Sequence, residues 1–198
     1  MKLVIATKNK GKIREIRKKL SDLDNIEVIP LTEIPNAPEV IEDGETFVAN
    51  ALKKAREISV FTKLTVLADD SGLVIDALRG RPGVYSARYG GETSDYITKN
   101  KLILKEMKNI NDSDRTAKFV CVMALKFPEG KEEIVRGECW GEITSSLKGT
   151  KGFGYDPIFF LPKHQKTMAE ISLEEKNRIS HRAQALEKIK NFLTTLPR

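Results

Sequence analysis

The sequence has no long hydrophobic segment and only two cysteines. Its longest unbroken apolar run is seven residues, at positions 119–125, whereas a helix that crosses a bilayer needs about 20. Cys121 and Cys139 stand 18 positions apart, which fits neither the paired spacing of a zinc site nor a disulfide-stabilised domain. The apolar segment at residues 3–6 is too short for a secretory signal peptide. We therefore expect a cytoplasmic protein with no membrane partner.

Internal repeats, low-complexity tracts and Ser/Gly linkers are also absent. The 198 residues are therefore predicted to form a single domain, residues 1–198. Hydrophobic residues make up 40% of the chain and charged residues 31%, which excludes disordered and fibrous classes. The formal net charge of +6 favours phosphate-bearing partners, either polymers or small molecules.

Hydrophobic patterning predicts an α/β fold. The segments with strand patterns are residues 1–6, 26–30, 64–68, 117–125 and 133–143. The segments with helical spacing are residues 12–23, 47–58 after a Thr46 cap, 93–107, and 181–193 after a Ser180 cap. Alternating strands and helices, with one long hairpin between the last two strands, predict a mixed central sheet with flanking helices.

A polar loop at residues 7–12 (TKNKGK) lies between the first strand and the first helix. Free N–H groups and the helix dipole favour an anion at a helix start, and the loop adds hydroxyl, amide and lysine donors. It is not a Walker loop, because the G-x-x-x-x-G-K-[ST] pattern occurs nowhere in the chain. The loop indicates a phosphate site, with a solvated, lysine-rich helix start as the alternative.

Two acidic groups are candidates for metal binding. Asp69 and Asp70 directly follow the strand predicted at residues 64–68, and open α/β folds bind ligands at the carboxyl ends of their strands. A hard divalent ion, Mg²⁺, would relieve their repulsion and bridge to phosphate oxygens; a turn stabilised by aspartate side chains is the alternative. The second group consists of Glu39, Glu42, Asp43 and Glu45. It precedes a helix start, where stabilisation of the helix dipole explains it as well as a metal role does.

Two further motifs suit recognition of a nucleobase. Phe153 is flanked by Gly152 and Gly154, so backbone and ring can approach a flat ligand closely; a tight turn with its aromatic rings in the core is the alternative. Ser180, His181 and Arg182 open the last predicted helix, where their polar groups can read base edges.

Five segments in register resemble the inosine/xanthosine triphosphate pyrophosphatase family over essentially the whole chain. They are TKNKGK at 7–12, ADDSGL at 68–73, PGVYSARY at 82–89, GFGYDPIF at 152–159 and SHRAQAL at 180–186. The resemblance implies a Mg²⁺-dependent enzyme that hydrolyses ITP, dITP and XTP to the monophosphate and pyrophosphate, removing deaminated purines from the nucleotide pool. It also implies a homodimer of two-lobed α/β subunits that bind substrate in a cleft between the lobes.

The resemblance implies roles for individual residues as well. Asp70 is the implied proton acceptor, and Glu42 and Asp70 are the implied Mg²⁺ ligands, with Asp69 close enough to share metal or base duty. Ser71 is an implied substrate contact. The implied triphosphate and phosphate contacts are Thr7, Lys8, Asn9, Lys10, Gly11, Lys12, Lys54 and Lys176. The implied base pocket consists of Phe153, Gly154, Tyr155, Asp156, His181 and Arg182.

Such an enzyme must distinguish deaminated bases from adenine. Hypoxanthine and xanthine carry a 6-keto acceptor where adenine carries an amino donor, so a cationic donor favours the deaminated bases. Arg182 is the donor we expect. A nucleic-acid-binding module is the competing class, supported by the net charge of +6 and a basic helix, but its basic residues are not interleaved with aromatic ones. We therefore expect no stable nucleic-acid partner. Within the enzymes, a pyrophosphatase for modified pyrimidine triphosphates is the alternative.

Overall fold

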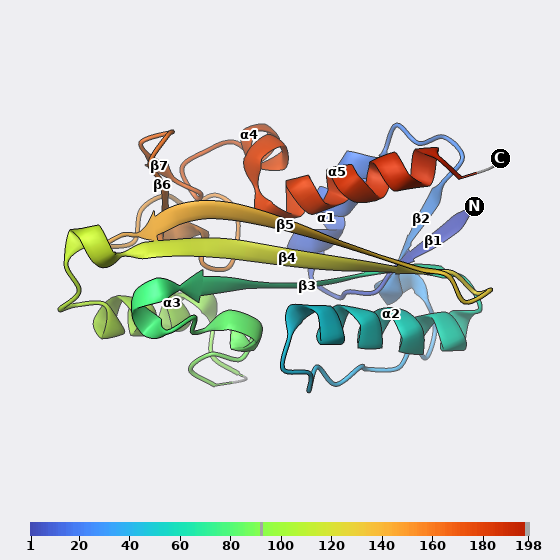
Figure 1. Ribbon diagram of the computed structural model, residues 1–198, viewed down its shortest axis with the longest axis horizontal. Coiled ribbons are helices and arrows are strands. Elements are labelled where there is room, and N and C mark those ends of the chain that lie inside the picture. Colours follow the sequence, from blue (N-terminus) through green and yellow to red (C-terminus); the bar gives the residue numbers. More distant parts are fainter. Residues whose placement is uncertain (92, 197–198) are drawn as a thin grey trace. The chain divides into compact units, whose positions relative to one another are not determined.

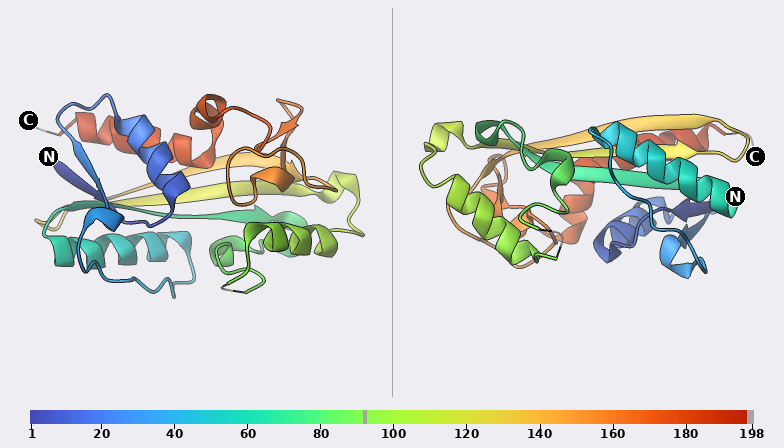
Figure 2. Two further views of the ribbon diagram at one scale, coloured as in Figure 1. Left: turned by 180° about the vertical axis from the view of Figure 1, so that it is seen from behind. Right: turned by 90° about the horizontal axis from the view of Figure 1, so that it is seen from below.

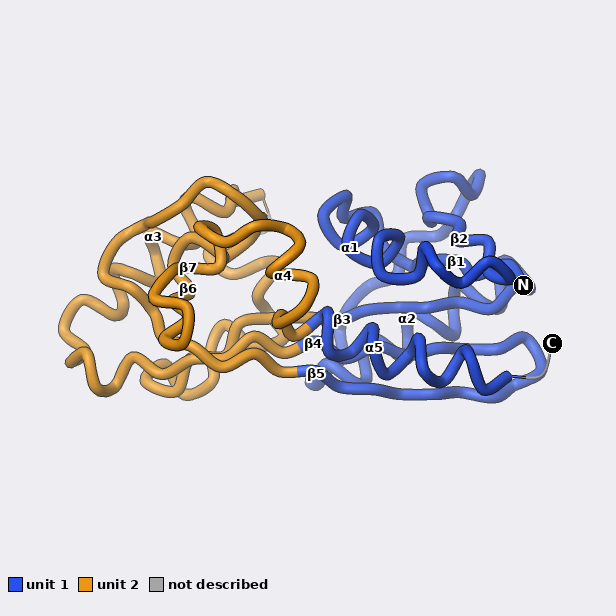
Figure 3. Tube along the Cα trace, turned by 90° about the horizontal axis from the view of Figure 1, so that it is seen from above, with its two compact units in different colours: residues 1–70, 121–137, 182–198 blue, residues 71–120, 138–181 orange. Residues whose placement is uncertain are grey.

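The computed structural model describes residues 1–91 and 93–196 and divides into two compact units (Figure 3). Unit 1 consists of Met1–Asp70, Cys121–Gly137 and Arg182–Arg198, and unit 2 consists of Ser71–Val120 and Glu138–His181. The prediction of a single domain over residues 1–198 stays a prediction, and it includes positions 92 and 197–198, which lie outside the described residues.

The described strands form one mixed sheet. They are β1 (Lys2–Ile5), β2 (Glu27–Pro30), β3 (Thr65–Ile75), β4 (Thr116–Lys126), β5 (Glu132–Ile143), β6 (Phe159–Leu161) and β7 (Lys166–Thr167). Hydrogen bonding gives the order β2-β1-β3-β4-β5-β6-β7. Strand β1 pairs in parallel with β2 and β3, whereas β6 pairs antiparallel with β5 and β7. This arrangement confirms the predicted α/β class with a mixed sheet.

The helices are α1 (Lys10–Leu20), α2 (Phe47–Thr62), α3 (Tyr96–Glu106), α4 (Leu173–Ile179) and α5 (His181–Thr194). Helices α1 to α4 begin where a side chain accepts a hydrogen bond from a free backbone N–H group. Thr46 caps α2 as predicted, because its Oγ1 accepts a hydrogen bond from Ala49 N–H at 3.1 Å. Asn9 and Asp95 cap α1 and α3 in the same way, so these helices begin at other residues than the hydrophobic spacing predicts. Within the described part of the chain, each helix is too short or too polar to span a membrane.

Unit 1 has helices on both faces of its strands, α1 and α5 on one face and α2 on the other (Figures 1 and 2). Leu3, Ile5 and Leu67 share a buried core with apolar residues of α1 and α5. Their neighbours Val4 and Val66 are also fully buried and point to the α2 face, because successive side chains of a strand alternate between its faces. Consecutive residues of β3 therefore meet different helices.

Unit 2 has a separate core. It includes Leu73 and Ile75 of β3, Ile103 of α3, and the rings of Phe119 and Phe159, which contact each other in a tilted arrangement. Helices α3 and α4 lie on opposite sides of the β4 and β5 strands of this unit (Figure 1). Residues of β3 belong to the cores of both units. A single strand therefore contributes apolar side chains to each of them.

A buried arginine ties the end of α3 to the end of β5 in unit 2. The Arg115 guanidinium donates to the carbonyls of Ile143 at 2.6 Å and Thr144 at 2.7 Å. It also donates to the carbonyls of Met107 at 2.9 Å and Ile110 at 3.3 Å, after the last turn of α3. One side chain thus satisfies four carbonyl groups, which is the kind of buried polar network that is costly to break.

We expect Arg115→Met to lower the free energy of unfolding by at least about 3 kcal/mol, because several buried carbonyls lose charged hydrogen bonds. Arg178→Met is the matched control, since Arg178 is exposed and pairs with Glu174 one helical turn away. Its cost should stay below about 0.5 kcal/mol. Urea denaturation followed by circular dichroism measures both, and equal losses would contradict the role of Arg115.

A bidentate ion pair joins α2 to the start of β5 in unit 1. Arg56 Nε donates to Glu132 Oε1 at 2.8 Å, and Arg56 Nη2 donates to Oε2 at 2.7 Å. These hydrogen bonds lower the pKa of Glu132 to about 2. Because the folded-state pKa is lowered, the stabilisation is present above the ordinary value of 4.5 and is lost as the pH falls through about 2.

A double-mutant cycle of Arg56→Met and Glu132→Gln should therefore give a pH-dependent coupling energy. We expect about 0.5–1 kcal/mol at neutral pH, because the arginine side chain is more than half exposed and solvent screens the pair. The coupling should decline between pH 4.5 and pH 2 as the glutamate is protonated. Denaturation curves over this range measure it, and a pH-independent coupling would be the contrary result.

Candidate functional site

The two adjacent aspartates lie inside β3. The sequence predicts a strand that ends at residue 68, but β3 continues to Ile75, so the prediction that they follow the end of their own strand was wrong. Strand β1, the parallel neighbour, ends at Ile5 opposite Leu67. Asp69 and Asp70 therefore occupy the part of β3 that extends past the end of β1, where residues 7–12 begin.

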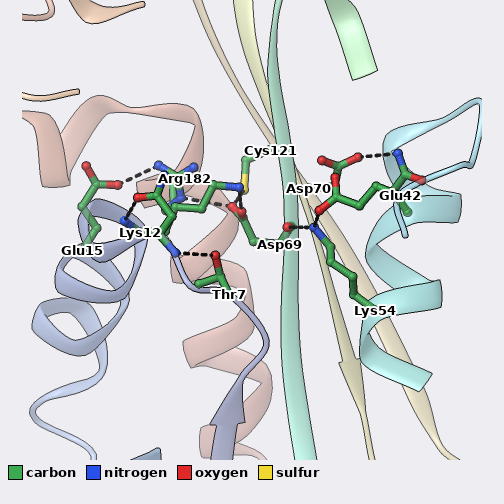
Figure 4. A network of polar contacts seen from close by, with 11 residues as sticks. Thr7, Lys12, Glu15, Glu42, Lys54, Asp69, Asp70, Cys121 and Arg182 are labelled. Atoms are coloured by element: carbon green, nitrogen blue, oxygen red, sulfur yellow. Dashed lines mark hydrogen bonds and ion pairs between the residues drawn. The ribbon is translucent and has the colours of Figure 1, made fainter. Parts of the chain in front are cut away.

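The alternation of side chains along β3 separates the two carboxylates. Figure 4 shows Asp69 on one side of β3 with Lys12 and Arg182, and Asp70 on the other side with Glu42 and Lys54. The first side is the face covered by α1 and α5, and the second is the face covered by α2. Two neighbouring carboxylates thus have different environments, although both are buried, with 2% and 4% exposed.

Asp69 is surrounded by hydrogen-bond donors. Lys12 Nζ donates to its Oδ1, while Arg182 Nε and Cys121 Sγ lie 3.0 and 3.1 Å from its Oδ2. Arg182 Nη1 also donates to Glu15 Oε2 at 2.7 Å. Burial alone would raise the pKa of Asp69, but the positive charges of Arg182 and Lys12 outweigh it and hold the pKa well below its usual range. Asp69 is therefore a permanent negative charge that fixes the two cations.

Lys12 is drawn inward by the same interaction. Burial opposes its charge, but the Asp69 carboxylate outweighs that effect, so the pKa of Lys12 is raised. Thr7 Oγ1 accepts from Asn9 N–H at 3.2 Å, and Asn9 Oδ1 accepts from Lys12 N–H at 3.1 Å. Lys8 and Lys10 are exposed. Residues 7–12 thus form an ordered helix start with one lysine turned toward β3 and two toward solvent.

Asp70 has a neutral donor instead. Asn50 Nδ2 donates to Asp70 Oδ2 at 3.0 Å, and no lysine or arginine among the described residues hydrogen-bonds this carboxylate. Burial, with a smaller contribution from the negative charge of Glu42, raises the pKa of Asp70 to about 6 against the opposing charge of Lys54. Asp70 is therefore a carboxylate that can gain or release a proton near neutral pH.

Glu42 and Lys54 complete the α2 side of the site. Lys54 Nζ donates to Glu42 Oε1 and to the backbone carbonyl of Asp69, both at 2.6 Å (Figure 4). Glu42 is half-buried, whereas Asp43 is exposed and pairs with Lys53 at 2.7 Å. Of the second acidic group, the structure thus brings Glu42 to Asp70 and directs Asp43 to a surface ion pair. We call Glu42, Asp69 and Asp70 the carboxylate group.

Unit 2 contains the second candidate site, residues 153–156, which we call the aromatic loop. Asp156 Oδ2 accepts from Phe153 N–H at 2.8 Å and from Lys176 Nζ at 2.5 Å. Lys176 Nζ also lies 4.4 Å from the centroid of the Phe153 ring. Gly152 has φ +75°, and a Cβ there would lie 2.1 Å from Asp156 Oδ2, so only glycine permits this closure. The predicted glycine-flanked aromatic residue, Phe153, therefore lies in a closed loop whose side chains bind Lys176.

The other candidates in unit 2 are buried supports. Tyr155 donates its hydroxyl proton to the Ser86 carbonyl at 2.7 Å, and Asn100 Nδ2 donates to the Gly154 carbonyl at 3.1 Å. His181 stacks on Phe119 with ring centroids 4.8 Å apart. These contacts fix the backbone of the aromatic loop and the start of α5. Ser71, half-buried, directly follows the carboxylate group in β3.

Four residues of these networks were not predicted as site residues: Glu15, Asn50, Asn100 and Cys121. Glu15 and Asn50 are polar residues buried in helices, and each lies beside an apolar residue that packs in the core. A polar residue on an apolar helix face is the signal that could have drawn attention to them. Nothing in the sequence marks Cys121, which lies within an apolar strand.

Comparison with known proteins places the whole chain in one family. The model of the Ham1 family matches residues 3–192. The chain belongs to the Ham1 family. Its relatives include proteins named "dITP/XTP pyrophosphatase". The one from Desulforamulus reducens is 46% identical over 99% of this chain and 97% of its own length, and the one from Geobacter sulfurreducens is 50% identical over 97% and 96%. A solved HAM1 protein from Coxiella burnetii has a TM-score of 0.91 at 44% identity, covering 99% of this chain and 100% of that one.

Loss of the Arg182 charge should destabilise this Ham1-family chain strongly. We expect Arg182→Met to lower the free energy of unfolding by about 3–5 kcal/mol, because the buried Glu15 would lose its arginine partner and the buried Asp69 would keep only Lys12 as a direct cationic partner. Adding Glu15→Gln to Arg182→Met should recover part of that loss. Urea denaturation of both single variants and the double variant measures the effect. Additive losses without recovery would refute the compensation.

Proposed function

We propose that this Ham1-family protein hydrolyses deaminated purine nucleoside triphosphates, namely ITP, dITP and XTP, to the monophosphate and pyrophosphate. The observation that carries the proposal is the separation of Asp69 and Asp70 on the two faces of β3. It provides a fixed lysine beside a carboxylate that accepts a proton near neutral pH. Relatives that bear the name "dITP/XTP pyrophosphatase" support the same activity.

Glu42 and Asp70 suit a magnesium ion. Glu42 lies near enough to Asp70 to help raise its pKa, and carboxylate oxygens are hard ligands of the type that Mg²⁺ prefers. No group of three or more acidic, histidine or cysteine side chains suited to a metal occurs among the described residues. Two carboxylates suffice for Mg²⁺, which commonly takes its other ligands from water and substrate phosphates. When bound, the ion supplies charge neutralisation of the triphosphate and polarisation of the attacked phosphorus.

Asp69 stands outside this metal set. Its Oδ1 accepts a hydrogen bond from Lys12, and its Oδ2 accepts from Arg182 and Cys121. The negative charge of Asp69 is therefore already compensated. Its role is to hold Lys12 in place. A lysine fixed by a buried carboxylate loses less conformational entropy when it binds an anion.

The remaining side chains of unit 1 bind phosphate and activate water. Asp70 orients the attacking water and takes its proton as the water oxygen bonds to the α-phosphorus, while the bond from that phosphorus to the α–β bridging oxygen breaks and pyrophosphate leaves. Free N–H groups at the start of α1, together with the exposed Lys8 and Lys10, bind the triphosphate oxygens. Lys54, held between Glu42 and the Asp69 carbonyl, adds a further cation for phosphate.

The aromatic loop reads the base. Phe153 offers its ring for stacking, and Lys176, which packs over this ring, offers a donor to a 6-keto oxygen. Its contacts lead us to assign Lys176 to the base instead of the phosphate role that the family resemblance implies. Arg182 was expected to be the base donor, but two of its nitrogens donate to Asp69 and Glu15. We therefore assign it the role of binding these two carboxylates instead of the base. Adenine presents a 6-amino donor to the Lys176 ammonium where the deaminated bases present an acceptor, which accounts for the discrimination.

The finer parts of the proposal follow the family resemblance. The enzyme works as a homodimer in the cytoplasm and has no stable nucleic-acid partner. The carboxylate group lies beside residues 7–12, which we call the phosphate loop, and its negative charge opposes a polyanion. This favours a small triphosphate over the nucleic-acid-binding alternative. The alternative substrates, modified pyrimidine triphosphates, lack the fused ring that a purine would stack on Phe153.

A substrate panel tests the proposal. We expect kcat/KM for ITP, dITP and XTP to exceed that for ATP by at least about 100-fold, because the 6-amino group of ATP cannot accept a hydrogen bond from the Lys176 ammonium. The product should be pyrophosphate, and removal of divalent cations with EDTA should abolish its release. The panel should include GTP and modified pyrimidine triphosphates. Equal turnover of ATP and ITP, or faster turnover of a pyrimidine nucleotide, would contradict the assignment.

Asp70→Asn in the same assay isolates the carboxylate. The swap preserves shape but removes the proton acceptor, so kcat for ITP should fall by about 100-fold or more. The matched control is Asp76→Asn, an exposed aspartate that directly follows the same strand, which should leave kcat unchanged. Circular dichroism spectra should agree among the three proteins. Near wild-type turnover of Asp70→Asn would remove this residue from the mechanism.

A further inference from the structure

Asn50 is a fully buried amide in α2 that contacts Asp70 of the carboxylate group and the loop that carries Glu42. Its Nδ2 donates to Asp70 Oδ2 at 3.0 Å, and its Oδ1 accepts from Gly44 N–H at 2.8 Å. Gly44 stands two positions after Glu42 in the chain. One side chain thus connects Asp70 on β3 with the loop that carries Glu42.

The orientation of this amide is fixed by chemistry. A backbone N–H can only donate, so the atom that faces Gly44 must be the amide oxygen. The amide nitrogen then faces Asp70 and donates to its carboxylate. The reversed amide would place two donors together at Gly44 and two acceptors together at Asp70. Both contacts therefore depend on an asparagine amide in this one orientation.

The loop is shaped to receive the amide. A Cβ at position 44 would lie 2.7 Å from Asn50 Oδ1 and 2.9 Å from the Ala49 Cβ, so only glycine allows this approach. Thr46 caps the helix between them, with its carbonyl accepting from Asn50 N–H at 3.1 Å. Asn50 therefore projects from a helix turn whose backbone is itself held in place.

A neutral donor suits the carboxylate of a cation site. A lysine or arginine at this position would hold Asp70 equally well, but its positive charge would compete with a cation for the same oxygens. An apolar residue would fill the same space but would form no hydrogen bond to orient the Asp70 carboxylate. The amide fixes one oxygen of Asp70 and adds no positive charge that would compete with a cation.

We propose that Asn50 is a positioning residue that holds Asp70 and the Glu42 loop in the arrangement needed to bind a divalent cation. This inference rests on the proposed function, in which these two carboxylates hold Mg²⁺. Partners that orient metal ligands commonly contribute 10- to 100-fold in metal affinity or activity. Asn50 touches neither the phosphate loop nor the aromatic loop in its hydrogen bonds, so it should affect metal binding and kcat more than the KM for nucleotide.

The test uses Asn50→Leu, which keeps the volume and removes both hydrogen bonds. Isothermal titration of the metal-free full-length protein with Mg²⁺ alone measures the affinity without any turnover. We expect binding about 10- to 100-fold weaker than wild type, a similar fall in kcat for ITP, and a KM for ITP within about threefold. Ser59→Ala is the matched control, since Ser59 is a buried polar residue of the same helix that donates to the Leu64 carbonyl at 3.0 Å. It should lose stability without changing Mg²⁺ affinity or kcat.

Gly44→Ala disturbs the same amide at its oxygen, which faces position 44. It is the test variant if Asn50→Leu does not fold. Its added methyl group must displace the Asn50 oxygen, so Mg²⁺ affinity and kcat should fall in the same direction. Unchanged Mg²⁺ affinity in the folded variants, or no Mg²⁺ binding by the wild type, would overturn the role of Asn50. Absence of pyrophosphate release from every nucleotide would instead refute the proposed function, while the Mg²⁺ titration still decides on Asn50.

Discussion

The chemistry of this protein depends on the pleat of one strand. Because side chains alternate along β3, Asp69 and Asp70 face different helices, and each helix face supplies a different set of partners. Asp69 meets Lys12 and Arg182, which keep it ionised. Asp70 meets a neutral amide and a second carboxylate, and burial raises its pKa to about 6. Two identical residues in succession therefore acquire distinct roles without any unusual backbone geometry.

The cost of burying these charges explains the polar residues around them. A buried carboxylate without compensation destabilises a fold by several kcal/mol, so Asp69 requires its cations, and Arg182 in turn requires Glu15. The network spans α1, β3, β4 and α5 of unit 1. It couples stability to function, because the interactions that hold the helices also fix the lysine that we assign to phosphate. Unit 2 repeats the principle on a smaller scale, where Asp156 holds Lys176 over an aromatic ring.

Features of the structure that depend on residues close in the chain could be predicted from the sequence. The cap at Thr46, the loop at residues 7–12 and the glycines around Phe153 depend on nearby residues, and all three are visible as patterns. The continuation of β3 to Ile75 was missed, because charged and small residues at 69–72 look like a turn until their partners from other elements are known. Helix α4, with seven residues, is too short to show a hydrophobic period. The roles of Glu15 and Arg182 depend on contacts 167 positions apart, which no local pattern reveals.

We infer that Asp70 and Glu42, and not Asp69, hold the metal. A crystal structure of the protein with Mg²⁺ and an ITP analogue whose α–β phosphate bridge resists hydrolysis tests it most directly. We expect an ion about 2.1 Å from oxygens of Asp70 and Glu42, with Asp69 still bound to Lys12 and Arg182. An ion coordinated by Asp69, with Lys12 released from it, would contradict the separation of roles across β3.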